Sequence, residues 1–182
     1  MPTTRSRPPT SVVVILTLGA LLAACATWDL RQTVITGDVV RTRQQLEQGL
    51  SPESPDDCGW TLLHYASYYQ HTPVVEYLLG KSVHVNATTT SHSGHCMMYS
   101  HIPAGSTPLI IAAYYGQADI IQLLLAHGAD RSVKNAEGYD AVTYARKFEF
   151  GVSVRILEGS AMEDRHPPSP SPPASTTSAP PR

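Results

Sequence analysis

The sequence has little of what catalytic and nucleic-acid-binding proteins need. Only 15% of its 182 residues are charged and the formal net charge is −2, so we expect no basic surface for nucleic acid or anionic lipid. The chain has no glycine-rich phosphate loop, no serine in a nucleophile-elbow motif and no paired carboxylates at helical spacing. We therefore expect no catalytic site and no cofactor.

A long apolar segment is also lacking. The apolar run from Val12 to Ala24 is too short to span a bilayer, but it follows Arg5 and Arg7 and ends in small residues. This combination of charge, length and small-residue ending is typical of a secretory signal. Residues 22–25 read Leu-Ala-Ala-Cys, a sequence that resembles the lipobox of bacterial lipoproteins.

The lipobox resemblance implies how the N-terminus is processed. In that class the lipobox cysteine, here Cys25, receives a diacylglyceryl group, and cleavage then removes the signal peptide, here residues 1–24. Residues 25–28 would form a lipidated N-terminus and short tether. Ala26 after the cysteine implies an outer-membrane lipoprotein that faces the periplasm of a diderm bacterium. The alternatives are an ordinary secretory signal cleaved nearby and a short uncleaved anchor.

An internal repeat is the strongest pattern in the chain. Residues 61–67 (TLLHYAS) recur as 107–113 (TPLIIAA), residues 74–79 (VVEYLL) recur as 120–125 (IIQLLL), and Gly105 lies 33 residues before Gly138. A repeat of this length indicates a stacked solenoid, whose units bury their apolar faces against one another.

Residues 105–130 carry the clearest copy of the repeat: Gly-x-Thr-Pro-Leu from Gly105, an Ala-Ala pair, a turn at Gly116 and a closing His-Gly-Ala-Asp. This copy resembles the ankyrin repeat. The resemblance predicts an all-α solenoid over residues 29–160, with about four helix-pair units joined by hairpin-like turns. The units are expected at about residues 29–53, 57–86, 104–135 and 136–160. It also implies a protein partner and no catalysis.

Residues that begin helices agree with the repeat. Thr61 and Thr107 stand where a hydroxyl can cap the first free amides of a helix, and Pro108 follows at the first helical position. Pro73 is expected in the first turn of a second helix. His64, by its place in Thr-Leu-Leu-His, resembles the ankyrin histidine that hydrogen-bonds between units, so we expect it to be structural.

One loop is longer than the period allows. Gly59 and Gly105 are 46 residues apart, so an insertion is expected at residues 87–102. It is rich in His, Cys and Met, the donor types that copper and zinc prefer. The candidate metal ligands are His92, His95, Cys96, Met97, Met98 and His101. Their spacing matches no established metal motif.

A disulfide between Cys58 and Cys96 is an alternative to a metal site. Both cysteines lie in turns that precede neighbouring units, so they should project from adjacent fingers of the stack. In an oxidising envelope compartment two such thiols tend to pair. The disulfide would remove Cys96 from the set of metal ligands.

Aromatic residues recur where the first helix of each unit ends, and they are the candidate partner-binding residues. They are Tyr68, Tyr69, Tyr114, Tyr115 and Phe148. In ankyrin-like stacks this end of the helix borders the concave groove, and tyrosine concentrates binding energy at interfaces. The alternative for each ring is a place in the core.

Residues 161–182 are rich in proline and serine, and we expect a disordered tail there because they cannot bury enough apolar surface. Taken together, the sequence predicts a lipid-anchored, non-catalytic ankyrin-repeat protein that mediates protein–protein interaction in the periplasm. The alternative function is a copper- or zinc-binding lipoprotein that uses the insertion loop.

Overall fold

The computed structural model describes residues 26–81, 83–90, 99 and 101–159. Within these residues the regular structure is helical. A first helix covers residues 26–35, and the others are α2 (Val39–Glu47), α3 (Leu62–Tyr68), α4 (Thr72–Leu79), α5 (Pro108–Tyr114), α6 (Ala118–Ala126), α7 (Ala141–Lys147) and α8 (Gly151–Glu158). None of the described helices is both long and apolar enough to cross a bilayer. The predicted signal peptide, Cys25 and the predicted tail lie outside the described residues.

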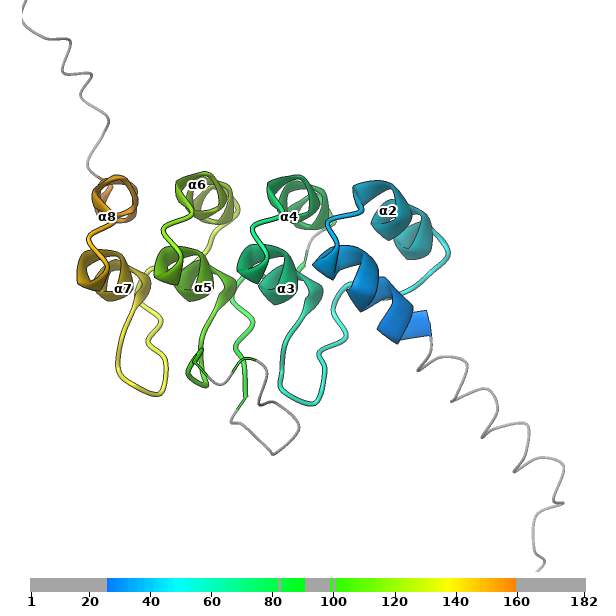
Figure 1. Cartoon of the computed structure of the whole chain (residues 1–182), viewed down its shortest axis with the longest axis horizontal. Coiled ribbons are helices and arrows are strands. Elements are labelled where there is room, and N and C mark those ends of the chain that lie inside the picture. Colours follow the sequence, from blue (N-terminus) through cyan, green and yellow to red (C-terminus); the bar gives the residue numbers. More distant parts are fainter. Residues whose placement is uncertain (1–25, 82, 91–98, 100, 160–182) are drawn as a thin grey trace, which may run out of the picture.

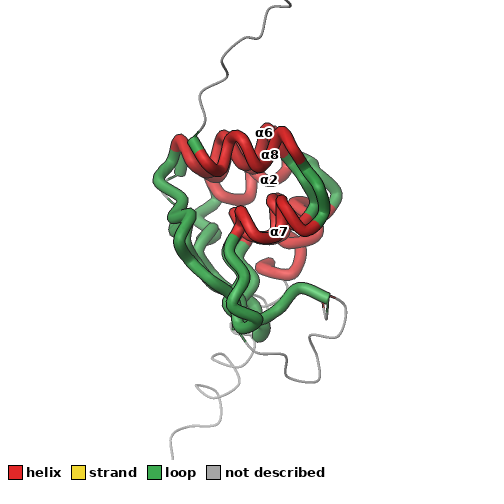
Figure 2. Tube along the Cα trace, turned by 90° about the vertical axis from the view of Figure 1, so that its left-hand side faces the viewer, coloured by secondary structure: helices red, strands yellow, loops and turns green. Residues whose placement is uncertain are grey.

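The helices form two layers, as Figure 1 shows. Helices α3, α5 and α7 make up one row, and α4, α6 and α8 make up the other, while long turns project from the side of the first row. Within each row consecutive helices are in contact, and each helix of one row packs on its partner in the other. Viewed along the stack in Figure 2, the units superimpose closely. The predicted all-α repeat solenoid is therefore confirmed.

Helices α3 and α5 begin directly after the two threonines that are predicted to cap them. Thr107 precedes α5, and its hydroxyl accepts a hydrogen bond from the Ile110 amide at 3.2 Å. Thr61 precedes α3, and its amide donates to Nδ1 of His64 at 3.1 Å. Pro108 occupies the first position of α5, where its missing N–H costs nothing. Pro73 lies in the first turn of α4 as expected.

Small and branched apolar side chains fill the space between the two layers. Ala66, Ile111 and Ala145 from the first row are fully buried, as are Val75 and Ile121 from the second row. Alanine in the first row lets neighbouring helices approach closely, whereas the branched residues fill the volume between rows. Such burial is the main source of stability in a stack of short helices.

The projecting turns repeat one hydrogen-bonding pattern. In the turn before α3, Oδ1 of Asp56 accepts from the amides of Cys58 and Trp60 at 2.9 and 2.8 Å. In the turn before α7, Oδ1 of Asn135 accepts from the corresponding amides at 3.0 and 3.1 Å. A short polar side chain therefore closes the turn in the same way at both places.

The insertion does not disturb the spacing of these turns. The Thr90 amide donates to the Cys58 carbonyl at 2.9 Å, and the Ala136 amide donates to the Ala104 carbonyl at 2.8 Å. At the base of the inserted segment, the amide of Gly105 donates to the carbonyl of Thr89 at 2.8 Å. Helices α3 and α5, which lie on either side of the insertion in the sequence, are therefore in direct contact.

Candidate functional site

Stacking brings all five predicted aromatic residues together. Each lies at the end of a first-row helix, so neighbouring units place their rings side by side. The centroid distance is 5.0 Å from Tyr69 to Tyr68 and 5.4 Å from Tyr68 to Tyr115. The row continues through Tyr114 at 5.0 Å to Phe148 at 4.9 Å. These edge-to-face contacts are favourable aromatic geometries.

A sixth ring extends the row. Phe150 precedes α8 and its centroid lies 6.2 Å from that of Phe148. It covers Gly116 so closely that a β-carbon there would come within 2.6 Å of the Phe150 ring, and Gly116 also has φ +68°, which favours glycine. We call the six residues Tyr69, Tyr68, Tyr115, Tyr114, Phe148 and Phe150 the aromatic ladder. Sequence reasoning missed Phe150, although it lies only two residues after Phe148.

One half of the ladder is contacted by the end of the insertion. Tyr99 is 8% exposed, and its hydroxyl lies 3.2 Å from the Tyr69 hydroxyl. Nε2 of His101 lies 2.7 Å from the Tyr115 hydroxyl and 3.3 Å from the Tyr68 hydroxyl. Desolvation and its contact with Tyr69 raise the pKa of Tyr99 above the ordinary value for tyrosine. The insertion therefore packs onto the ladder at Tyr69, Tyr68 and Tyr115, and we call these three residues the covered half.

Trp60, in the turn before α3, packs against the rings of this covered half. Its indole is 3% exposed and stacks on the Tyr99 ring with a centroid distance of 4.3 Å and an interplanar angle of 28°. It also meets Tyr65 at 5.2 Å and Tyr68 at 5.5 Å. The hydroxyl of Tyr65 in turn donates to Asp56, which closes the turn before α3. Trp60 was absent from the predicted site because it falls in a turn.

The other half of the ladder, Tyr114, Phe148 and Phe150, is partly exposed, and we call it the open half. Phe148 is 39% exposed, while Tyr114 and Phe150 are half-buried. Nζ of Lys147 lies 6.0 Å from the centroid of Phe148 and 4.9 Å from that of Tyr139, so a positive charge borders the rings. The five predicted residues thus share one ladder, but the insertion contacts only part of it.

His64 has the structural position that its motif predicts. It is fully buried, and its Nε2 lies 3.2 Å from the carbonyl oxygen of Ser106 in the next unit. Desolvation by burial lowers the pKa of His64 to about 4, although its backbone contacts oppose this shift. The imidazole is therefore neutral near pH 7 and links two units.

The predicted metal ligands are almost all outside the described residues. His92, His95, Cys96, Met97 and Met98 lie there, and no metal geometry is described for them. His101 is described, and it contacts tyrosine hydroxyls. Within the described part of the chain, no cluster of three or more His, Cys, Asp or Glu residues could hold a metal ion.

Cys58 is part of a disulfide. The other two cysteines of the chain, Cys25 and Cys96, lie outside the described residues. Cys58 is half-buried. Its carbonyl accepts the hydrogen bond from the amide of Thr90, where the inserted segment begins. The pairing of Cys58 with Cys96 stays a prediction.

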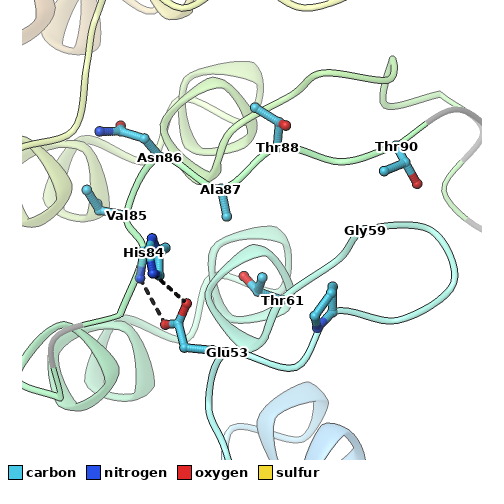
Figure 3. Close-up of a pocket in the computed structure, with 10 residues that line it drawn as sticks. Glu53, Gly59, Thr61, His84, Val85, Asn86, Ala87, Thr88 and Thr90 are labelled. Atoms are coloured by element: carbon cyan, nitrogen blue, oxygen red, sulfur yellow. Dashed lines mark hydrogen bonds and ion pairs between the residues drawn. The ribbon is translucent and has the colours of Figure 1, made fainter.

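A cavity of about 540 Å³ lies at the opposite end of α3 from the ladder. Figure 3 shows it between two extended segments, one around Thr61 and one running from His84 to Thr90. At its edge Glu53 accepts a hydrogen bond from the His84 amide at 2.9 Å, and their side chains point toward each other. None of the predicted site residues lines this cavity. Its lining combines three threonines with the apolar residues Pro55, Val85 and Ala87.

Comparison with known proteins identifies the repeat. A family model described as ankyrin repeats (3 copies) matches residues 34–135. The chain is 34% identical over 107 residues to palmitoyltransferase AKR1 of Lachancea kluyveri. This match covers 57% of this chain and 13% of that protein. It is 28% identical over 115 residues to palmitoyltransferase Hip14 of Drosophila melanogaster, covering 63% of this chain and 16% of that protein.

The similarity is therefore to a small part of each relative. A third match, to palmitoyltransferase ZDHHC17 of Homo sapiens, is 28% identical over 117 residues and covers 17% of that protein. The chain spans less than a fifth of the length of these three relatives. Because the ankyrin-repeat model covers more than half of the chain and spans helices α2 to α6, the chain belongs to the ankyrin-repeat family.

Proposed function

We propose that this chain is a lipid-anchored protein of the bacterial envelope that binds a protein partner through the open half of the aromatic ladder. The proposal combines two features. The ankyrin repeats are a binding scaffold, and the ladder supplies rigid aromatic side chains at its edge. The lipid anchor at Cys25 and the periplasmic location rest on the lipobox sequence alone.

The partial exposure of Phe148 is the observation that carries the binding proposal. A large apolar ring that is 39% exposed and continuous with half-buried rings gains free energy when a partner covers it. Aromatic side chains have few torsions to freeze on binding, so they contribute strongly to association. Lys147 beside the rings adds a charge that can select among partners.

Acyl transfer is not part of the proposal. The palmitoyltransferase relatives match over 13–17% of their length, and this stretch coincides with ankyrin repeats. Metal binding by the insertion has no support from the described residues, because His101 is engaged by tyrosine hydroxyls. It remains an alternative that metal titration of the purified protein can test.

Crosslinking in intact cells tests partner binding. Cells that express the full chain are treated with a mild crosslinker, and the chain is purified from their membranes. The captured partner is compared with that of a double variant, Tyr114→Ala with Phe148→Ala. The matched control is Val152→Ala, because Val152 is also exposed, at 45%, but lies on α8 outside the ladder. A specific partner should be lost from the double variant and kept by the control. Equal capture by all three chains would contradict the proposal.

The membrane anchor needs a separate test. Cys25→Ser should abolish processing and release the protein from membranes, because a serine hydroxyl cannot form the thioether to lipid. The wild-type mature protein should carry a lipid-sized mass increment on Cys25. If the variant is still processed and membrane-bound, the lipoprotein proposal is wrong while the partner-binding proposal stands.

A further inference from the structure

The open half of the ladder, Tyr114, Phe148 and Phe150, has closely spaced rings. The centroids lie 4.9 Å apart from Tyr114 to Phe148 and 6.2 Å apart from Phe148 to Phe150. Successive rings are turned by 68° and 42°. Such a row presents alternating ring faces and edges. Polyproline II segments are recognised by aromatic surfaces of this kind.

The same chain contains a proline segment with a matching period. Residues 167–173 read Pro-Pro-Ser-Pro-Ser-Pro-Pro, so Pro167, Pro170 and Pro173 recur every third residue. A polyproline II helix has three residues per turn and rises about 9 Å per turn, which would place these three rings on one face. One such turn spans about two steps of the ladder.

The chain between the solenoid and this segment is long enough to reach. Phe148 and Phe150 flank the start of α8, and the chain leaves the solenoid at the end of α8 after Gly159. Helix α8 has eight residues, so the exit point is about 12 Å from the ladder. Residues 160–166 span up to about 24 Å when extended, which covers that distance with slack.

The connecting residues carry charges of both signs, with acidic side chains in excess. Glu163, Asp164 and Arg165 fall within them. Lys147 stands at the end of α7 with its Nζ 6.0 Å from the Phe148 centroid. A path of the connecting residues past the end of α7 would bring the two carboxylates near this lysine at the edge of the ladder. This attraction is modest because the groups are exposed to solvent.

We propose that residues 167–173 dock in cis, as a polyproline II helix, on the open half of the ladder at Tyr114, Phe148 and Phe150. This inference rests on the proposed function, in that the ladder is the binding surface. The docked tail competes with the partner for the same rings. Partner binding is therefore autoinhibited, and a partner must displace a proline segment that is tethered at high effective concentration.

Site-specific photocrosslinking tests the contact. The full chain carries p-benzoylphenylalanine in place of Phe148, or at the control position in place of Val40, which is 77% exposed on α2. Trypsin cuts after Arg165, so residues 166–182 are released as one peptide. Crosslinks to this peptide should be at least tenfold more abundant from position 148 than from position 40. Equal yields would overturn the proposal.

A pair of tail variants tests the proline face. Pro170→Ala with Pro173→Ala removes two prolines from the proposed contact face, whereas Pro168→Ala with Pro172→Ala removes two from the other faces. Both pairs lower polyproline II preference similarly. The first should reduce the crosslink from position 148 at least tenfold, and the second less than twofold. Equal losses would show that no specific proline face is bound.

Two further readouts separate this inference from its alternatives. In an equal mixture of isotopically light and heavy chains, crosslinks should join peptides of the same label. If about half of the crosslinks join a light peptide to a heavy one, as random pairing between chains gives, a second copy supplies the tail, which overturns docking in cis. The Pro170 and Pro173 variant should also capture more partner than the wild type. Crosslinking without any ladder-dependent capture would overturn the proposed function alone, and capture without crosslinking would overturn this inference alone.

Discussion

The two halves of the aromatic ladder occupy equivalent positions in the repeat but differ in what surrounds them. Tyr69, Tyr115 and Phe148 stand at the same point of three successive units. The Tyr69 hydroxyl meets Tyr99 from the insertion, whereas Phe148 is 39% exposed. A repeat therefore determines where a side chain lies, but an insertion determines whether it remains available for binding.

The largest expected effect tests whether the covered half is part of the core. Trp60→Ala removes a ring that is 3% exposed and touches Tyr65, Tyr68 and Tyr99. It should lower the free energy of unfolding by about 5 kcal/mol, near the upper limit for a large buried ring. Phe148→Ala is the control and should cost about 1 kcal/mol. Urea unfolding followed by circular dichroism measures both. Similar losses would contradict the division into halves.

The disulfide of Cys58 is expected to fasten the insertion beside the covered half. If its partner is Cys96, as the sequence predicts, Cys58→Ala should lower the free energy of unfolding by about 4 kcal/mol on the chain-entropy model, less any strain. Peptide mapping without reductant should identify the linked pair in protein isolated from the envelope. Free thiols at both positions would rule the pairing out.

The sequence predicts much of this site because most of it follows from the repeat. Thr61 and Thr107 cap helices, and His64 bridges units, because local periodicity fixes their positions. The contacts of Tyr99 and His101 could not be predicted, because the insertion belongs to no period and its path depends on packing. Trp60 and Phe150 lie outside helices, where apolar periodicity gives no signal.

Lowering the pH should reduce the free energy of unfolding through a histidine beside the covered half. Its neighbour His64 has a pKa lowered to about 4 by burial, while the unfolded chain takes up the proton near pH 6.5. Between these values the unfolded state binds more protons, so stability falls as pH falls through this window, by about 3 kcal/mol in total. The equivalent residues in the next units, Ile110 and Thr143, do not titrate.

The measurement for this prediction is the slope of unfolding free energy against pH between 6.5 and 4. His64→Gln should reduce the slope, whatever its effect on absolute stability. The control, His127→Gln, alters an exposed histidine in another unit and should leave the slope as it is in the wild type. An unchanged slope in His64→Gln would show that other groups cause the acid sensitivity.

The two halves of the ladder should contribute unequally to partner affinity, which is the next largest expected effect. Phe148→Ala should weaken binding of the captured partner by more than about 2 kcal/mol, roughly thirtyfold, because an exposed ring can act as a hot spot. Tyr69→Ala alters the equivalent residue in the covered half and should change affinity by only a small factor, while costing more stability through the lost contact with Tyr99. Titration calorimetry gives the affinities. The reverse order would place the binding surface at the insertion.

The smallest expected effect concerns His101, which joins the insertion to the ladder. His101→Ala removes the contacts of Nε2 with the hydroxyls of Tyr115 and Tyr68, and should lower the free energy of unfolding by about 1 kcal/mol. Amide exchange should quicken at Ile102, whose N–H donates to the carbonyl of Tyr99. The same variant tests the metal alternative: if His101 is a ligand, Cu(I) or Zn(II) will raise the melting temperature of the wild type but not of the variant. Equal responses to metal, together with faster exchange, would assign His101 to the ladder.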